Sequence, residues 1–152
     1  LGAEVVSGDL DDQASLERSL AERDHVQDPD GRFRINNVFC HADSWRSALP
    51  RLVEDGDAVL MDLRSFSETN TGCIHELRHL AQNVPFDRCL LTVDETTDEP
   101  FLERTLKEAW EQLSPGSANH SQSPGEATVH RFESGTVAFR RLLRRLCDAG
   151  AR

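Results

Sequence analysis

Short apolar runs alternate along this chain with amphipathic stretches, which is the pattern of strand-helix-strand units. The clearest run, 58–63, is apolar at nearly every position, as expected of a strand buried on both faces of a parallel sheet. Runs at 88–93 and 128–132 have the same character. A short first strand is expected at 3–6, and an extended segment at 33–39.

Apolar residues at helical spacing predict helices between these strands, because positions three and four apart share one helix face. The strongest pattern is 99–113, where Trp110 falls on the apolar face and is expected in the core. In the helix expected at 44–53, Pro50 removes a backbone donor, so a kink or a late start is expected. The other predicted helices are 12–24, 71–84 with Thr71 as its cap, and 137–147.

The last predicted helix and the loop before it complete this pattern. Five apolar side chains of the helix are expected to face inward: Phe139, Leu142, Leu143, Leu146 and Cys147. The segment 114–127 is rich in Ser, Pro and Gly, which predicts a mobile loop. The whole chain, 1–152, is expected to form a single α/β domain, a three-layer sandwich on a mostly parallel sheet of about five strands.

Composition narrows the range of partners. The chain has 17 basic and 27 acidic side chains and a formal net charge of −10, so a nucleic acid would be repelled and is not expected as a partner. No apolar run approaches the roughly 20 residues that cross a bilayer. Four arginines near the end of the chain are the local exception, and two interpretations stay open: complementing the helix dipole, or an interaction patch. They are Arg140, Arg141, Arg144 and Arg145.

The cysteines indicate a reducing compartment. Cys40, Cys73, Cys89 and Cys147 are widely spaced, and no C-x-x-C pair marks a zinc or redox site. Buried free thiols are the simplest interpretation, which favours the cytoplasm. Because the sequence begins with Leu1, we expect a piece of a longer protein, whose other parts include a second domain or a membrane anchor.

Candidate chemistry lies where strands end. In an open α/β sheet, ligands bind beyond the carboxyl ends of the strands. This rule indicates Gly8-Asp9, Asp94 and the polar loop that follows Asp62. In that loop, Gly72 allows close approach to the next helix, and Glu76 lies one turn in, at the edge of the apolar stripe. The plainer interpretation is a solvated Glu76 and an Asp62 that caps a loop.

These residues resemble two known families. A strand, a polar loop and Gly72-x-x-x-Glu76-Leu77 are similar to the nucleoside 2-deoxyribosyltransferases, and Cys73-Ile74-His75-Glu76-Leu77 resembles the Cys-x-x-Glu-Leu stretch of TIR domains. The resemblance covers about 45–81. Arg78 stands where the transferases usually have Gly, and 2–9 show no TIR first-strand signature. The resemblance implies a flavodoxin-like or TIR-like fold.

The resemblance also implies a function. In both families the matching glutamate acts on an N-glycosidic bond, of NAD or of a nucleoside, so Glu76 would be the catalytic carboxylate. By the same resemblance, Asp62, Arg64, Ser65 and Asn70 would line the pocket, and the positions of Gly72 and Asp94 at the helix start and strand end add them as ligand-binding candidates. NAD or a nucleoside would be a substrate, and no cofactor is implied. The alternative is a non-catalytic signalling module of the same fold, which binds partner chains or associates with itself.

A second motif overlaps the first. His75-Glu76-Leu77-Arg78-His79 matches H-E-x-x-H, in which two imidazoles one turn apart hold zinc and the glutamate is a general base. Helical geometry, however, places His75 and His79 opposite the apolar stripe, so both are expected to face solvent. A zinc metalloprotease is therefore only a remote alternative, and no metal site is predicted.

Overall fold

The computed structural model describes residues 8–10, 17, 21, 29, 38–40, 45–54, 56–121, 127–133 and 135–151 of the chain. The chain divides into two compact units, Leu1–Leu52 and Val53–Arg152. In the first unit, β1 (Gly8–Leu10) and β2 (Val38–Cys40) pair in parallel. The helix α2 (Trp45–Glu54) spans the boundary in the sequence between the two units.

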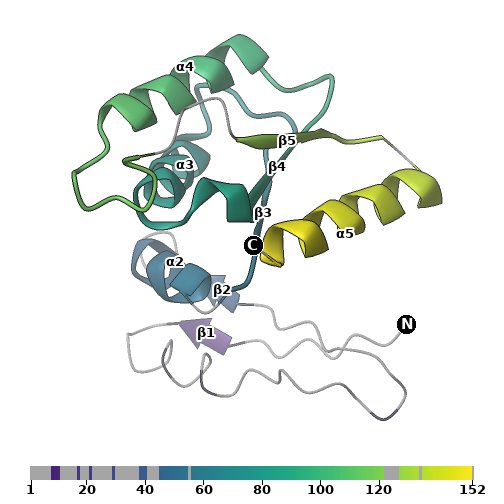
Figure 1. Cartoon of the computed structure of the whole chain (residues 1–152), viewed down its shortest axis with the longest axis horizontal. Helices are drawn as coiled ribbons and strands as arrows, with labels where there is room; N and C mark the ends of the chain where they lie inside the picture. Colours follow the sequence, from purple (N-terminus) through teal and green to yellow (C-terminus); the bar gives the residue numbers. More distant parts are fainter. Residues whose placement is uncertain are drawn as a thin grey trace. The chain divides into compact units, whose positions relative to one another are not determined.

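The second unit is built on a three-stranded parallel sheet (Figure 1). Its order is β3 (Val59–Asp62), β4 (Cys89–Val93) and β5 (Thr128–Arg131), with Met61, Leu91 and Val129 in register. All five residues of β4 are buried, as a central strand requires.

The run 58–63, predicted to be buried on both faces, forms an edge strand among the described residues, and Leu60 is 44% exposed. An apolar sequence alone did not distinguish the edge from the centre. The prediction of a buried central strand is therefore wrong for β3 and right for β4.

Helices cover both faces of this sheet. Figure 1 shows α3 (Thr71–Asn83) and α4 (Glu99–Glu111) on one side of the strands and α5 (Thr136–Gly150) on the other. The main core lies between the sheet and the first two helices, because their apolar stripes point at the same strand face. Its fully or nearly fully buried members include Leu63, Leu77, Leu80, Ala81, Leu91, Val93 and Leu102.

Trp110 is partly buried and packs against this core, where it was predicted to lie. Its ring packs edge-on against Phe86, with 4.9 Å between ring centroids, and Phe86 is fully buried at the start of the short helix η1 (Phe86–Arg88). Asn119 is also fully buried. Its side chain donates to the carbonyls of Ala81 and Val84 and accepts from the backbone N–H of Phe86.

The orientation of α5 differs from the prediction. Ala138, Leu142 and Ala149 face inward, whereas Phe139 and Leu143 are 54% and 44% exposed. Cys147, also predicted to be inward, is exposed, and Leu146 is partly buried. The prediction followed the largest apolar side chains, but small alanines are what allow the helix backbone to approach the sheet closely.

Other predictions concern element ends. The N-cap of α3 is Asn70, and Thr71 is the first helical residue. The helix α2 begins at Trp45 with Pro50 inside it, so a late start is wrong. The predicted strand 3–6 lies outside the described residues, as does most of the predicted helix 12–24.

The coarse prediction is confirmed: the fold is α/β with a parallel sheet. Among the described residues, no helix is both long and apolar enough to cross a bilayer.

Candidate functional site

The carboxyl ends of β3 and β4 bring the predicted polar residues together. Asp62 ends β3, and Asp94 follows the last residue of β4. Because the strands are parallel and in register, Asp62 pairs with Thr92, and the next backbone N–H, that of Leu63, donates to the Thr92 carbonyl at 2.8 Å. The two loops that follow therefore leave the same edge of the sheet, where open α/β folds bind ligands.

Asp62 and Arg64 form a bidentate pair at this edge. The Arg64 Nε donates to both carboxylate oxygens, at 2.8 and 3.0 Å, and a second guanidinium nitrogen completes the fork. These bonds hold the pKa of Asp62 below its ordinary value, against the opposing effect of burial. The guanidinium also lies 4.6 Å from the ring centroid of Phe132, just after β5, so Arg64 connects the ends of the outer strands.

Ser65 and Asp94 connect the two loops. Ser65 has φ +60°, a left-handed conformation that costs a residue other than glycine of the order of 1 kcal/mol. Its hydroxyl lies 2.8 Å from that of Thr96. The Asp94 carboxylate accepts from the Thr96 hydroxyl at 2.6 Å and its backbone N–H at 2.9 Å, which lowers the pKa of Asp94. Such strain is found more often at binding sites than elsewhere.

Glu76 is partly buried in the second turn of α3. Its charge acts on the Cys73 thiol, whose pKa is raised first by burial and then by the negative charges of Glu76 and Asp62. Both carboxylates therefore lie near the same thiol, one on the helix and one at the strand end. Within the described part of the chain, no hydrogen bond or ion pair holds the Glu76 carboxylate.

Asn70 and Gly72 organise the loop and the helix start. The Asn70 side-chain oxygen accepts from the backbone N–H and the hydroxyl of Ser67, each at 2.9 Å, so it is occupied within its own loop. A Cβ atom at Gly72 would meet nothing within 4 Å. The close protein contact that a glycine permits is therefore not made there.

The histidines of H-E-x-x-H lie differently from the expectation. His75 is exposed, but His79 is partly buried, and both line a cavity of about 360 Å³ whose other lining residues include Ala109 of α4 and Gln112, which follows α4. Burial, and to a lesser extent the charge of His75, lower the pKa of His79. The predicted solvent exposure is confirmed for His75 and wrong for His79, because the position of α4 does not follow from the helical pattern of α3.

The surroundings of His79 disfavour metal ligation through its buried nitrogen. The Asn83 side-chain amide donates to the His79 carbonyl at 2.9 Å and lies 3.3 Å from His79 Nδ1. This arrangement favours the tautomer that carries its proton on Nε2, which has no hydrogen-bond partner. A protonated nitrogen has no lone pair to offer a metal. The described residues contain no group of three His, Cys, Asp or Glu side chains that could hold a metal ion.

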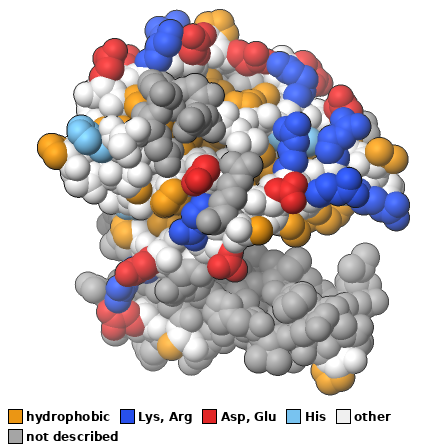
Figure 2. Space-filling view, viewed as in Figure 1, with side chains coloured by type: hydrophobic (Ala, Val, Ile, Leu, Met, Phe, Trp, Pro, Cys, Tyr) orange, Lys and Arg blue, Asp and Glu red, His pale blue; other side chains and the backbone are white. Residues whose placement is uncertain are grey.

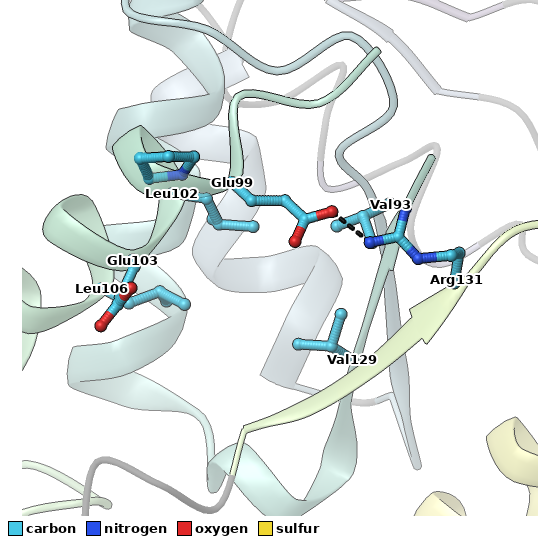
Figure 3. A pocket seen from close by; sticks show the side chains of 8 residues that line it. Val93, Glu99, Leu102, Glu103, Leu106, Val129 and Arg131 are labelled. Carbon is cyan, nitrogen blue, oxygen red and sulfur yellow. Dashed lines mark hydrogen bonds and ion pairs between the residues drawn. The ribbon is translucent and has the colours of Figure 1, made fainter. Parts of the chain in front are cut away.

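A larger groove of about 720 Å³ lies between α4 and β5 (Figure 3). Its apolar lining includes Val93, Leu102, Leu106 and Val129. Figure 3 shows Glu99, from the first turn of α4, extending towards Arg131 on β5, with which it forms an ion pair. Its size and apolar lining are typical of ligand pockets.

Sequence reasoning missed several residues of this region. Phe132, which stacks with Arg64, and Arg131, which lines the groove, both lie at the end of β5. The rule about strand ends was applied to β3 and β4 but not to β5, although it would have indicated both. Thr96 is a further residue that the sequence does not indicate, because a hydroxyl in a turn carries no motif.

Comparison of the chain with protein-family models, with curated proteins and with solved structures gives no significant match.

Proposed function

We propose that the carboxyl edge of the β3-β4-β5 sheet binds a nucleoside or a nucleotide, and that Glu76 promotes cleavage of its N-glycosidic bond. The observation that carries the proposal is the convergence of Asp62, Arg64, Ser65 and Asp94 at one sheet edge, with Glu76 nearby across Cys73. The proposal includes the TIR-like or deoxyribosyltransferase-like resemblance of 45–81 and, with it, a flavodoxin-like or TIR-like fold.

The charge at this edge suits a cationic transition state. Three carboxylates, of Asp62, Asp94 and Glu76, accompany one guanidinium, so the formal charge of the group is negative. Cleavage of an N-glycosidic bond spreads positive charge over C1′ and the ring oxygen of the sugar, and a carboxylate already in place stabilises that charge without reorganisation. Carboxylate oxygens also accept hydrogen bonds from ribose hydroxyls.

The balanced reaction is hydrolysis. The bond between C1′ and the base nitrogen breaks, and its electron pair leaves with the base. Water then adds to C1′ and loses a proton, which goes to solvent when the substrate is NAD and to the departing base when the substrate is a neutral nucleoside. From NAD the products are nicotinamide, ADP-ribose and a proton, so neither an oxidant nor a reductant is needed. Glu76 is the group to which we assign stabilisation of the cationic sugar.

The test is release of free base. The full chain is incubated with NAD and, separately, with a purine and a pyrimidine nucleoside, and the products are separated by chromatography. Glu76→Gln is expected to lower the rate about a hundredfold or more, because it removes the charge and keeps the shape. Glu68→Gln, on the exposed loop, makes the same charge change and should leave the rate unaltered. No release by the wild-type protein, or equal release by Glu76→Gln, refutes the enzymatic proposal.

The second candidate function is a non-catalytic binding module. The specific observation in its favour is that no described neighbour holds the Glu76 carboxylate, whereas Asp62 and Asp94 are each held by two or more hydrogen bonds. In that case a nucleotide raises the melting temperature without turnover, because a ligand of the folded state stabilises it. Asp62→Asn should reduce this thermal shift, and Glu76→Gln should not.

A further inference from the structure

The helix α5 carries an unbalanced cluster of positive charge. Arg140, Arg141, Arg144 and Arg145 are all exposed, and none forms an ion pair with a carboxylate within the described part of the chain. Arg145 donates only to the Val129 carbonyl, at 3.3 Å. In Figure 2, Lys and Arg side chains gather on the side of the molecule where Figure 1 places α5. In a chain of net charge −10, such a cluster requires an explanation.

An apolar row runs beside these cations. Phe139 and Leu143 are 54% and 44% exposed, and being four residues apart they lie one above the other on the helix. Arg140 and Arg144 each follow one of them in the sequence, so they form a second, parallel row. We call these four residues the α5 double row. Val137, at the start of the helix, is 73% exposed but, being two residues before Phe139, lies on another side of the helix.

The positive charge of α5 also affects the pKa of a histidine on the adjacent strand. His130 on β5 is buried, and its pKa is lowered first by burial and then by the charges of Arg145 and Arg141, with Glu133 acting in the opposite direction. At His130, therefore, the charge of Glu133 does not cancel that of these two arginines.

We propose that the α5 double row adsorbs to an anionic lipid bilayer, with Phe139 and Leu143 entering the interface and Arg140 and Arg144 on the lipid phosphates. A cationic row beside an apolar row is the pattern of helices that lie in the plane of a membrane interface. All the cations are arginines, whose planar fork binds phosphate oxygens in pairs. This proposal does not depend on the proposed catalysis.

The size of the patch favours a bilayer over a protein partner. A stable protein interface buries roughly 800 Å² on each side around a cluster of apolar anchors. Two apolar residues supply much less. Adsorption to a charged bilayer needs only a few exposed side chains. Each arginine near an anionic surface contributes attraction, and one or two apolar side chains add to it.

The test uses the full chain and vesicles of two compositions. Co-sedimentation is measured with phosphatidylcholine vesicles and with vesicles that contain about a third phosphatidylglycerol, at about 0.1 M salt. The proposal predicts binding to the anionic vesicles at least about tenfold stronger than to the neutral ones, and its loss at about 0.5 M salt. Wild-type protein that does not bind anionic vesicles refutes it.

Matched variants separate this patch from net charge. Arg140→Glu/Arg144→Glu should lower binding to anionic vesicles about tenfold or more. Arg78→Glu/Arg104→Glu changes the net charge by the same amount at exposed positions on α3 and α4 and should keep most of the binding. Phe139→Ser/Leu143→Ser, with charge unchanged, should weaken it severalfold. Circular dichroism establishes that each variant is folded.

Two results would overturn the proposal. Equal loss in both charge-reversal variants would assign the binding to net charge rather than to α5. The second is that the wild-type chain binds soluble poly-glutamate but not vesicles, and that Arg140→Glu/Arg144→Glu loses this binding. That result would assign the patch to an acidic protein partner.

Discussion

Asn119 shows how one side chain can hold several backbone groups. It is fully buried in the segment 114–127, for which composition predicts a mobile loop. Its amide donates to the carbonyls of Ala81 and Val84 at 2.6 and 2.7 Å, and its oxygen accepts from the Phe86 N–H at 2.8 Å. One polar residue therefore pairs with three backbone groups between α3 and η1, and of these only the Ala81 carbonyl has a second described donor, the Ser117 hydroxyl at 3.2 Å.

Asn119→Ala should destabilise the protein by about 2–4 kcal/mol, because the loss of one amide leaves the Val84 carbonyl and the Phe86 N–H unpaired and removes one of two donors to the Ala81 carbonyl. The measurement is the free energy of unfolding from urea titration. Gln112→Ala, at an exposed position, is the matched control and should change stability by less than about 0.5 kcal/mol. Equal effects of the two substitutions would contradict this interpretation of Asn119.

The cysteines differ in their expected reactivity. Burial raises the pKa of Cys89 to about 12, and burial followed by nearby carboxylates raises that of the partly buried Cys73. Cys147 is exposed. The thiolate is the reactive form, so at pH 8 Cys147 should be alkylated first, Cys73 more slowly, and Cys89 only after unfolding. Peptide mapping by mass spectrometry after timed iodoacetamide treatment measures the order, and rapid labelling of Cys89 in the folded protein would contradict it.

At the scale of elements, the difference between the central and edge strands has an energetic consequence. Leu91 on β4 is fully buried, whereas Leu60 on β3 is 44% exposed. Leu91→Ala should therefore cost about 2–5 kcal/mol, because it removes buried methyl groups and leaves a cavity. Leu60→Ala, the same chemical change, should cost less than about 1 kcal/mol. Urea titration measures both, and similar costs would mean that Leu60 is covered in solution.

The sequence predicted the bounds of helices and strands better than it predicted which elements pack against each other. The strands β4 and β5 and the helices α3 and α4 begin and end within a few residues of the predicted positions, because periodicity is local information. The edge position of β3 and the exposure of Phe139 depend on which elements pack together, and periodicity does not contain that. Ser65 shows the same limit, since its left-handed backbone is imposed by tertiary contacts and a serine does not signal it.

In the candidate site, too, the sequence predicted what depends on the order of elements and not what depends on tertiary contacts. The strand-end rule correctly brought Asp62 and Asp94 to one edge of the sheet, because it needs only the order of elements and parallel strands. It did not predict that Arg64 would turn back onto Asp62 and stack on Phe132, because those contacts depend on rotamers and on a third strand. The role of Glu76 stays a prediction.

For the whole molecule, four groups with lowered pKa values give stability a defined pH dependence. His79 and His130 have folded pKa values below their ordinary 6.5, and Asp62 and Asp94 have values below 3.8. In each case the unfolded chain binds the proton more readily than the folded one. Each contribution is complete above the unfolded pKa and is lost as the pH falls through the folded pKa.

Two losses of stability are therefore expected on acidification. The first begins as the pH drops below about 6.5 and comes from the histidines, and the second begins below about 3.8 and comes from the carboxylates. Relief of repulsion in a chain of net charge −10 works in the opposite direction as carboxylates are protonated. The informative quantity is therefore the difference between variants rather than the absolute slope.

His79→Gln/His130→Gln should flatten the dependence of the urea midpoint on pH between 8 and about 5, because it removes both groups that must stay neutral in the folded state. His120→Gln, at an exposed position, is the control and should leave the wild-type slope unchanged. The contradicting result is a wild-type urea midpoint that rises from pH 7 to about 5 as steeply as the midpoint of His79→Gln/His130→Gln. Burial of these two rings would then not govern acid stability, and charge repulsion across the whole surface would.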